Sequence, residues 1–281
     1  MTRDLSPAAY VRPPRSSLAL GAITFRDRPF QATLDAAAGA GFDGVGVTVG
    51  QCLSALERGI PLDQLPVLVE RAGLHVAELE LVRLCEQGAV RHANDLVLDL
   101  AGTLDPDRVH VAAWTGEPQQ IADAFAHVCA ELPETPVAFE FMAYNAVPGF
   151  AAALDLSAAT GMANASVVLD ILHFFRTHAS FEDVTPEAMH RVAVVQLSDV
   201  VTRPRGDELD EARHRRTYPG EGSLDSVEFV RRVRRTGVVP PISVEPINDA
   251  YEQLPLAVVA DRAMVATARL LQAVEAVDQE E

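Results

Sequence analysis

The stretch FQATLDAAAGAGFDG, residues 30–44, decides the fold class of this chain. Apolar residues recur in it at helical spacing from Phe30 onward, and glycines follow at the point where such a helix is expected to end. A second apolar run, Val45–Val49, comes directly afterwards and has the length of a buried strand. The stretch therefore predicts a helix that ends at a glycine and leads into a strand.

The same plan recurs along the sequence. LDQLPVLVERAGLHV (62–76) repeats it with Gly73 as the helix end, and SLDSVEFVRRVRRTGVV (223–239) repeats it with Ser223 as the expected N-cap and Gly237 after the last turn. Eight apolar runs have strand length: Leu18–Phe25, Val45–Val49, His75–Leu81, Arg108–Ala112, Val137–Phe141, Ser166–Leu169, Val192–Leu197 and Ile242–Glu245. Strands that alternate with helices indicate a parallel sheet of the α/β class. Eight such units favour a (β/α)8 TIM barrel, although periodicity alone does not exclude an open doubly wound sheet.

The domain organisation follows from the absence of any linker-like segment. We expect a flexible N-terminal segment over residues 1–17, which is polar and rich in proline, and one barrel domain over residues 18–276. The acidic end VEAVDQEE (274–281) is expected to fray.

Composition narrows the functional classes. The chain is 48% hydrophobic with a formal net charge of −17, which argues against nucleic-acid binding because duplex-binding proteins carry a basic face. No stretch resembles a membrane span or a secretory signal. The three cysteines, Cys52, Cys85 and Cys129, have neither zinc spacing nor a disulfide pattern. We therefore expect a cytoplasmic protein without a membrane partner.

Polar side chains occur where four consecutive apolar runs end. Glu140 comes from PVAFEF, Asp170 from SVVLD, Gln196 from VAVVQLSD and Glu245 from PISVEP. The carboxyl ends of barrel strands carry function, so these side chains are expected to meet in the barrel mouth. Three converging carboxylates repel one another unless a cation lies between them, and Asp170 needs compensation among its apolar neighbours. Because all four donors are oxygens, we predict one divalent ion, Mg²⁺ or Mn²⁺, with Co²⁺ as a further candidate.

The chain resembles the xylose isomerase-like barrels, the sugar phosphate isomerase and epimerase group, from about Leu18 onward. The resemblance is most specific in AFEF (138–141), VLDILHFFR (168–176), VVQLSD (194–199), RRTYPGEGSLD (215–225) and SVEP (243–246). It implies that Glu140, Asp170, Gln196 and Glu245 bind one divalent metal and that His173 binds the substrate. Most of the family has histidine where Gln196 stands, and glutamine there is similar to some 3-dehydroshikimate dehydratases of the same superfamily.

An arginine-rich segment, Arg203 to Gly222, follows the seventh apolar run and contains turn-forming prolines and glycines. One interpretation is a solvated loop. The other is a lid in which Arg203, Arg215 and Arg216 bind an anionic or polyhydroxylated substrate through fork-like hydrogen bonds. The resemblance favours an arginine of RRTYPGEG and leaves the choice between Arg215 and Arg216 open. Three aromatic residues are further candidates to line the pocket: Phe25, Trp114 and Tyr144.

The resemblance implies an isomerase or epimerase that moves a proton next to a carbonyl of a small polyhydroxylated substrate. The metal would stabilise an enediolate, Glu140 and Glu245 would remove and return the proton, and His173 would hold a substrate oxygen. The alternative is a lyase resembling 3-dehydroshikimate dehydratase, in which the enolate of a keto acid expels water with His173 as acid or base. A DNA-repair protein of the AP-endonuclease type and a non-catalytic binding protein are remote alternatives. A homo-oligomer is compatible with the resemblance, because dimers and tetramers are common among relatives.

Overall fold

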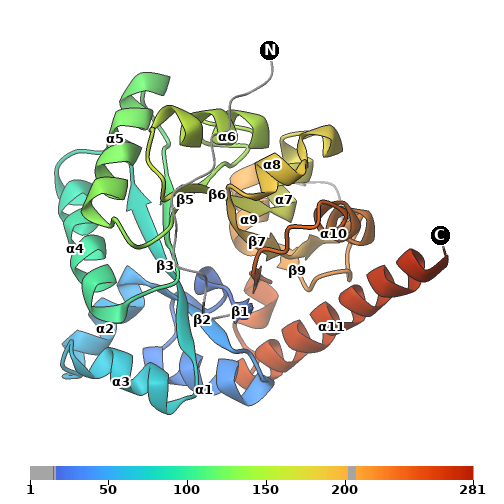
Figure 1. The fold of residues 1–281 in the computed structure, drawn as a ribbon. Helices are drawn as coiled ribbons and strands as arrows, with labels where there is room; N and C mark the ends of the chain where they lie inside the picture. Colours follow the sequence, from blue (N-terminus) through green and yellow to red (C-terminus); the bar gives the residue numbers. More distant parts are fainter. Residues whose placement is uncertain (1–14, 16, 202–206, 281) are drawn as a thin grey trace.

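The computed structural model describes residues 15, 17–201 and 207–280, and it shows a closed barrel of eight parallel strands (Figure 1). Around the barrel the strands follow the order β1-β10-β7-β6-β5-β4-β3-β2. Their bounds are Leu18–Leu20 (β1), Gly44–Thr48 (β2), His75–Arg83 (β3), Val109–Ala112 (β4), Val137–Glu140 (β5), Ala165–Asp170 (β6), Val192–Leu197 (β7) and Ile242–Val244 (β10). Each of the eight predicted apolar runs overlaps one barrel strand, which confirms the predicted (β/α)8 fold.

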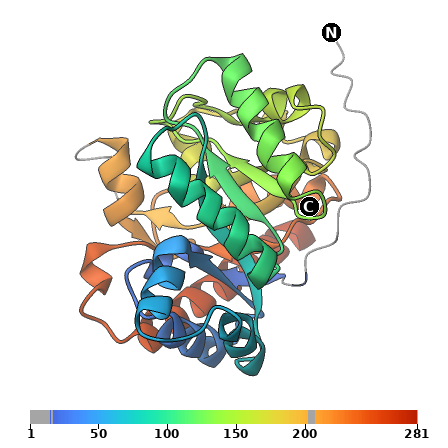
Figure 2. The ribbon, with the colours of Figure 1, turned by 90° about the vertical axis from the view of Figure 1, so that its left-hand side faces the viewer.

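Helices surround the barrel on its outside (Figures 1 and 2). The long C-terminal helix α11 packs against α1 and α10. The α-helices are Phe30–Ala40 (α1), Val49–Glu57 (α2), Gln64–Arg71 (α3), Ala89–Leu104 (α4), Pro118–Glu131 (α5), Phe150–Ala159 (α6), Ile171–Arg176 (α7), Pro186–Met189 (α8), Glu208–His214 (α9), Ser226–Arg235 (α10) and Leu256–Glu280 (α11). Among the described residues, none of these helices is long and apolar enough to cross a membrane.

The predicted helix-to-strand unit forms as its sequence dictates. Helix α1 buries Phe30, Leu34 and Ala37 against the core and ends at Gly41, whose φ of 89° is a left-handed conformation that favours glycine. The N-cap of α10 differs from the prediction. Asp225 caps this helix by accepting a hydrogen bond from the Glu228 N–H, whereas the hydroxyl of Ser223 donates to the Val200 carbonyl.

The first strand is shorter than predicted. β1 ends at Leu20, and a 3-10 helix, η1 (Ala22–Phe25), takes up the rest of the predicted run. Gly21 lies between them, and a Cβ atom at this position would overlap the side chain of Glu245. The chain therefore turns away from the barrel at a residue that leaves room for Glu245.

The structure can be compared with the predicted segments at both ends of the chain. Residues 1–14 and 16 of the expected flexible segment lie outside the described residues, and Arg15 forms an ion pair with Asp107 at 3.0 Å. At the other end, α11 continues to Glu280 and so includes residues 274–280 of the acidic end, whose fraying stays a prediction.

The barrel interior is divided into an apolar and a polar half. Ala138, Val168 and Val194, from β5, β6 and β7, form a small apolar cluster. The other half contains buried polar side chains from β3, β4 and β10, among them Glu78, His110 and Ser243. The four predicted ligand positions lie on β5, β6 and β7 and directly after β10, which are consecutive around the barrel.

A short antiparallel hairpin follows β7. It consists of β8 (Asp199–Val200) and β9 (Arg216–Thr217), with α9 in the connection between them. Residues 202–206, including Arg203, are outside the described part of the chain, so the prediction for Arg203 lies there too. The hairpin matters for the site because it carries Arg216.

Candidate active site

Four side chains come together at the carboxyl ends of neighbouring strands. Glu140 and Asp170 are the last residues of β5 and β6, Gln196 pairs with Asp170 in register, and Glu245 directly follows β10. Asp170, Gln196 and Glu245 are no more than 1% exposed, whereas Glu140 keeps 7%. The site is thus enclosed on the side of the first three residues and more open at Glu140.

Asp170 is held through both of its carboxylate oxygens. Oδ1 accepts a hydrogen bond from the His173 N–H at 2.9 Å and so caps helix α7, which explains the three-residue spacing between them. Oδ2 accepts a hydrogen bond from Arg216 Nη1 at 2.6 Å. Burial raises the pKa of Asp170, but Arg216 and the hydrogen bonds outweigh it and bring the pKa below its usual value. Arg216 is thus a partner of Asp170 that the sequence did not predict, in addition to the metal ion that was expected there.

The Arg216 guanidinium lies close to several side chains of the site. It is 1% exposed, and its Nη1 also lies 3.4 Å from Ser198 Oγ and 3.6 Å from Glu245 Oε2. Nη2 lies 3.5 Å from His173 Nε2. Of the two arginines between which the sequence left the choice open, Arg216 is the one in the site. Arg215 is exposed and pairs with Asp210 at 2.5 Å.

Glu140 and Glu245 differ from Asp170 in the direction in which their pKa values are shifted. Burial, and after it the nearby charge of Glu80, raises the pKa of each of these glutamates well above its ordinary value. Glu245 Oε1 accepts a hydrogen bond from Gln196 Nε2 at 3.2 Å, and Gln196 Oε1 is left buried without a hydrogen-bond partner. The site thus combines two carboxyl groups that hold protons readily with an amide oxygen that is free to accept a ligand.

His173 is buried in its neutral form. Burial lowers the pKa of its imidazole to about 4, so it carries no charge at neutral pH. Its Nε2 lies 3.7 Å from Glu140 Oε1, and the ring of Tyr144 contacts the imidazole edge-on at 5.6 Å between centroids. His173 therefore faces both an acidic side chain and the guanidinium of Arg216.

A second polar network, not anticipated from the sequence, lies beside this site. Glu78 Oε2 accepts a hydrogen bond from Arg108 at 3.1 Å, and its Oε1 accepts from Ser243 Oγ at 2.8 Å and from the Ala22 N–H at 3.0 Å. His110 Nδ1 lies 2.9 Å from Glu80 Oε1, without the angle of a hydrogen bond. The sequence signal for this network is the alternation in AELEL (77–81), which places both glutamates of β3 on the inner face of the barrel. Because the Glu78 carboxylate already has these donors, this network is less suited to a metal than the first site.

A family model, described as xylose isomerase-like TIM barrel, matches residues 34–267. The chain belongs to this family.

Two curated relatives of this xylose isomerase-like barrel are enzymes with different reactions. A 3-dehydroshikimate dehydratase of Pseudomonas aeruginosa is 27% identical over 236 residues, which cover 79% of this chain and 37% of the relative. An inosose isomerase of Halalkalibacterium halodurans is 26% identical over 143 residues, which cover 48% of this chain and 50% of the relative. The chain therefore spans half or less of the length of these relatives.

Among solved structures, the crystal structure of the IOLI protein with a bound zinc atom has a TM-score of 0.77 to this chain. The two are 18% identical, and the alignment covers 91% of this chain and 98% of that one. At this identity the likeness shows the shared fold.

The residues of the first site fit a divalent metal ion. The orphaned Gln196 Oε1 is a buried acceptor that lacks a donor, which is how an amide oxygen is left when its partner is a cation. When Glu140, Asp170 and Glu245 are all ionised, three negative charges face the single positive charge of Arg216, and a divalent ion balances the excess. Glu140 and Asp170 also place carboxylate oxygens within 4.8 Å of each other.

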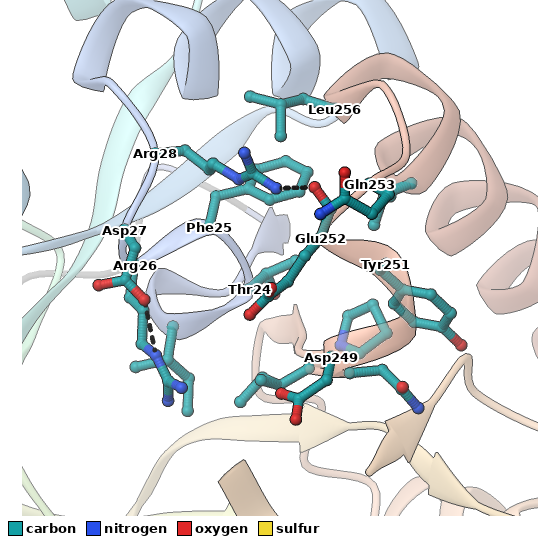
Figure 3. Close-up of a pocket in the computed structure, with 15 residues that line it drawn as sticks. Thr24, Phe25, Arg26, Asp27, Arg28, Asp249, Tyr251, Glu252, Gln253 and Leu256 are labelled. Carbon is teal, nitrogen blue, oxygen red and sulfur yellow. Dashed lines mark hydrogen bonds and ion pairs between the residues drawn. The ribbon is translucent and has the colours of Figure 1, made fainter. Parts of the chain in front are cut away.

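Of the three candidate aromatic residues, Phe25 lines a cavity of about 290 Å³ beside the candidate metal site (Figure 3). Trp114 instead packs under the guanidinium of Arg83, whose carbon lies 4.5 Å from the centroid of the indole ring. This cavity lies between the loops that follow β1 and β10, and Arg28 closes one edge by donating a hydrogen bond to the Glu252 carbonyl. Pro246, the neighbour of Glu245, lines it as well, so the cavity adjoins the site.

Proposed function

We propose that this chain is a divalent-metal-dependent isomerase or epimerase that transfers a proton at a carbon next to a carbonyl. The observation that carries the proposal is the pair of Glu140 and Glu245. Both are buried carboxyl groups, and Asp170 and Gln196 lie on the two strands between them. Two carboxyl groups at opposite ends of this set are placed so that one can remove a proton from a bound substrate and the other can return one.

Glu140, Asp170, Gln196 and Glu245 would hold the ion, and their oxygen donors favour Mg²⁺ or Mn²⁺. When bound there, such an ion supplies Lewis-acid polarisation of a substrate carbonyl. The zinc atom of the IOLI structure belongs to that protein and supports a divalent ion in a barrel of this fold.

The side chains of this chain would perform the remaining steps. Glu140, the most open of the ligands, would remove the proton from one face of the carbon, and Glu245 would return a proton from the other. His173, neutral and next to Glu140, would bind a substrate oxygen. Enclosure by Tyr144 and Arg216 would keep bulk water from the reacting carbon. The substrate would be a small polyhydroxylated compound.

A second candidate is dehydration of a keto acid. It is favoured by the dehydratase relative, whose match covers more of this chain than the match to the inosose isomerase. In that reaction the same proton removal would be followed by loss of a hydroxyl β to the carbonyl, with His173 protonating the leaving oxygen. The proton on His173 would have to come from Glu140, which lies 3.7 Å away.

Proton NMR in D₂O separates the two candidates. The protein is supplied with Mn²⁺ for turnover, stripped of Mn²⁺ before detection, and tested on a panel of ketoses, inososes and cyclic keto acids. Deuterium that enters a product with the same carbon skeleton and the same oxygen count supports an isomerase or epimerase, whereas a product that has lost water supports the lyase. Failure to exchange any proton on the whole panel, with metal bound, would count against both.

A further inference from the structure

The position of Arg216 links the hairpin after β7 to the candidate metal ligands. Its backbone lies in β9, where it pairs with Val200 and its carbonyl accepts a hydrogen bond from Asn248 Nδ2 at 2.9 Å. Its Nε donates to the Ala212 carbonyl at 2.8 Å. These contacts hold the backbone and Nε of Arg216 in place, and Nη1 and Nη2 are the groups directed at Asp170 and His173.

Asp170 is shared between this arginine and any ion in the site. One of its oxygens accepts from the His173 N–H and the other from Arg216 Nη1 at 2.6 Å, so each oxygen has one lone pair left for a cation. Glu245 Oε2 lies 3.6 Å from the same Nη1. Two of the four ligands are thus already in the field of a fixed positive charge before an ion arrives.

The positive charge of Arg216 has two opposite effects on metal binding. A guanidinium attracts the carboxylates on which a metal depends and repels the metal itself, and in a buried site both effects are much stronger than in water. Arg216 also holds the Asp170 carboxylate in place when no ion is bound, through the hydrogen bond from Nη1 to Oδ2 at 2.6 Å. Arg216 therefore orients Asp170 as a ligand and at the same time lowers the affinity of the site for the metal ion.

We propose that Arg216 is a positioning residue that sets the metal affinity of this site: it holds Asp170 ready as a ligand and, by its charge, keeps the ion weakly bound and exchangeable. This inference rests on the proposed metal-dependent function. It differs from the expectation that Arg216 only binds substrate, because the effect is present without any substrate.

The test is a Mn²⁺ titration of metal-stripped protein at pH 8, without substrate, in which free Mn²⁺ is measured by electron paramagnetic resonance. Arg216→Gln removes the charge and is expected to lower the Kd for Mn²⁺ at least tenfold. Arg216→Lys keeps the charge and is expected to stay within threefold of the wild type. Arg215→Gln removes a neighbouring surface charge that pairs with Asp210 and serves as the matched control, with an unchanged Kd.

Thermal unfolding provides a second measurement on the same variants. Metal-stripped Arg216→Gln is expected to melt below the wild type, because its carboxylates lose their cation, and Mn²⁺ is expected to raise its Tm by more than it raises that of the wild type. Arg216→Met, of similar length and without charge, is measured in parallel in case Arg216→Gln does not fold.

The results of these titrations distinguish failure of this inference from failure of the proposed function. Unchanged or weaker Mn²⁺ binding by the uncharged variants would overturn the inference, and so would an Arg216→Lys variant that binds as tightly as Arg216→Gln. In both cases the wild type still binds Mn²⁺ and the proposed function stands. A wild type that binds no Mn²⁺ would overturn the proposed function and this inference with it.

Discussion

The side-chain amide of Gln196 donates a hydrogen bond to Glu245 over 3.2 Å and leaves its own buried oxygen without a hydrogen-bond partner. This orientation makes Gln196 a neutral oxygen ligand and ties it to the glutamate on the next strand of the barrel. The metal preference of the site therefore depends on this pair.

Gln196→His is expected to move the metal preference toward Co²⁺ and Zn²⁺. Imidazole nitrogen gains more than amide oxygen from the Irving–Williams trend, so the ratio of the Mn²⁺ Kd to the Co²⁺ Kd should rise roughly tenfold or more. Competition titrations of the wild type and the variant measure it. An unchanged metal ranking would mean that Gln196 does not bind the ion.

Glu245→Gln is expected to abolish turnover while the fold is retained. The substitution preserves the shape of a side chain that is 1% exposed and removes the group that would return the proton. Loss of a general acid or base lowers the rate by about 10²–10⁴-fold. Steady-state assays and circular dichroism are the measurements, with Glu275→Gln on the exposed face of α11 as the control. Activity within tenfold of the wild type would argue against the role of Glu245.

His173→Ala is expected to lose activity and keep the metal. His173 Nε2 lies 3.5 Å from the positively charged Arg216, so this nitrogen is better placed to meet a substrate oxygen than an ion. Elemental analysis and an activity assay separate the two effects, and exposed His190→Ala is the matched control. A variant without bound metal would show that His173 is itself a ligand.

The chelated protein is expected to lose stability as the pH rises above the ordinary pKa of a glutamate. The folded-state pKa values of Glu140 and Glu245 are raised above their unfolded values. The folded state therefore holds these protons more tightly, and stability falls as the pH rises from the unfolded pKa toward the folded pKa. Mn²⁺ should remove most of this loss, because it replaces the protons. Tm measured against pH, with and without EDTA, tests this; equal slopes would contradict it.

The strands of the barrel were predictable because each is a short apolar run, and most of them end at a glycine or a polar residue. The end of β1 was not, because its boundary is set by contact between Gly21 and Glu245, which are 224 residues apart in a chain of 281. The cap of α10 was misplaced for a similar reason: Ser223 is a good capping residue by type, but its hydroxyl is engaged by the Val200 carbonyl of β8.

The convergence of Glu140, Asp170, Gln196 and Glu245 could be anticipated from the order of the strands. The partner of Asp170 could not, because Arg216 reaches it from a hairpin 46 residues later in the chain. The approach of His110 to Glu80 was not predicted either, since a glutamate or histidine inside a strand gives no indication of which neighbour it faces.

The central claim is that these carboxylates hold one divalent ion, and a calorimetric titration of metal-stripped protein with Mn²⁺ tests it most directly. The account predicts saturable binding of one ion per chain in the wild type and no saturable binding in a Glu140→Gln, Glu245→Gln double variant that remains folded. A folded wild-type protein that binds no Mn²⁺, Mg²⁺ or Co²⁺, or a double variant that binds as the wild type does, would contradict it.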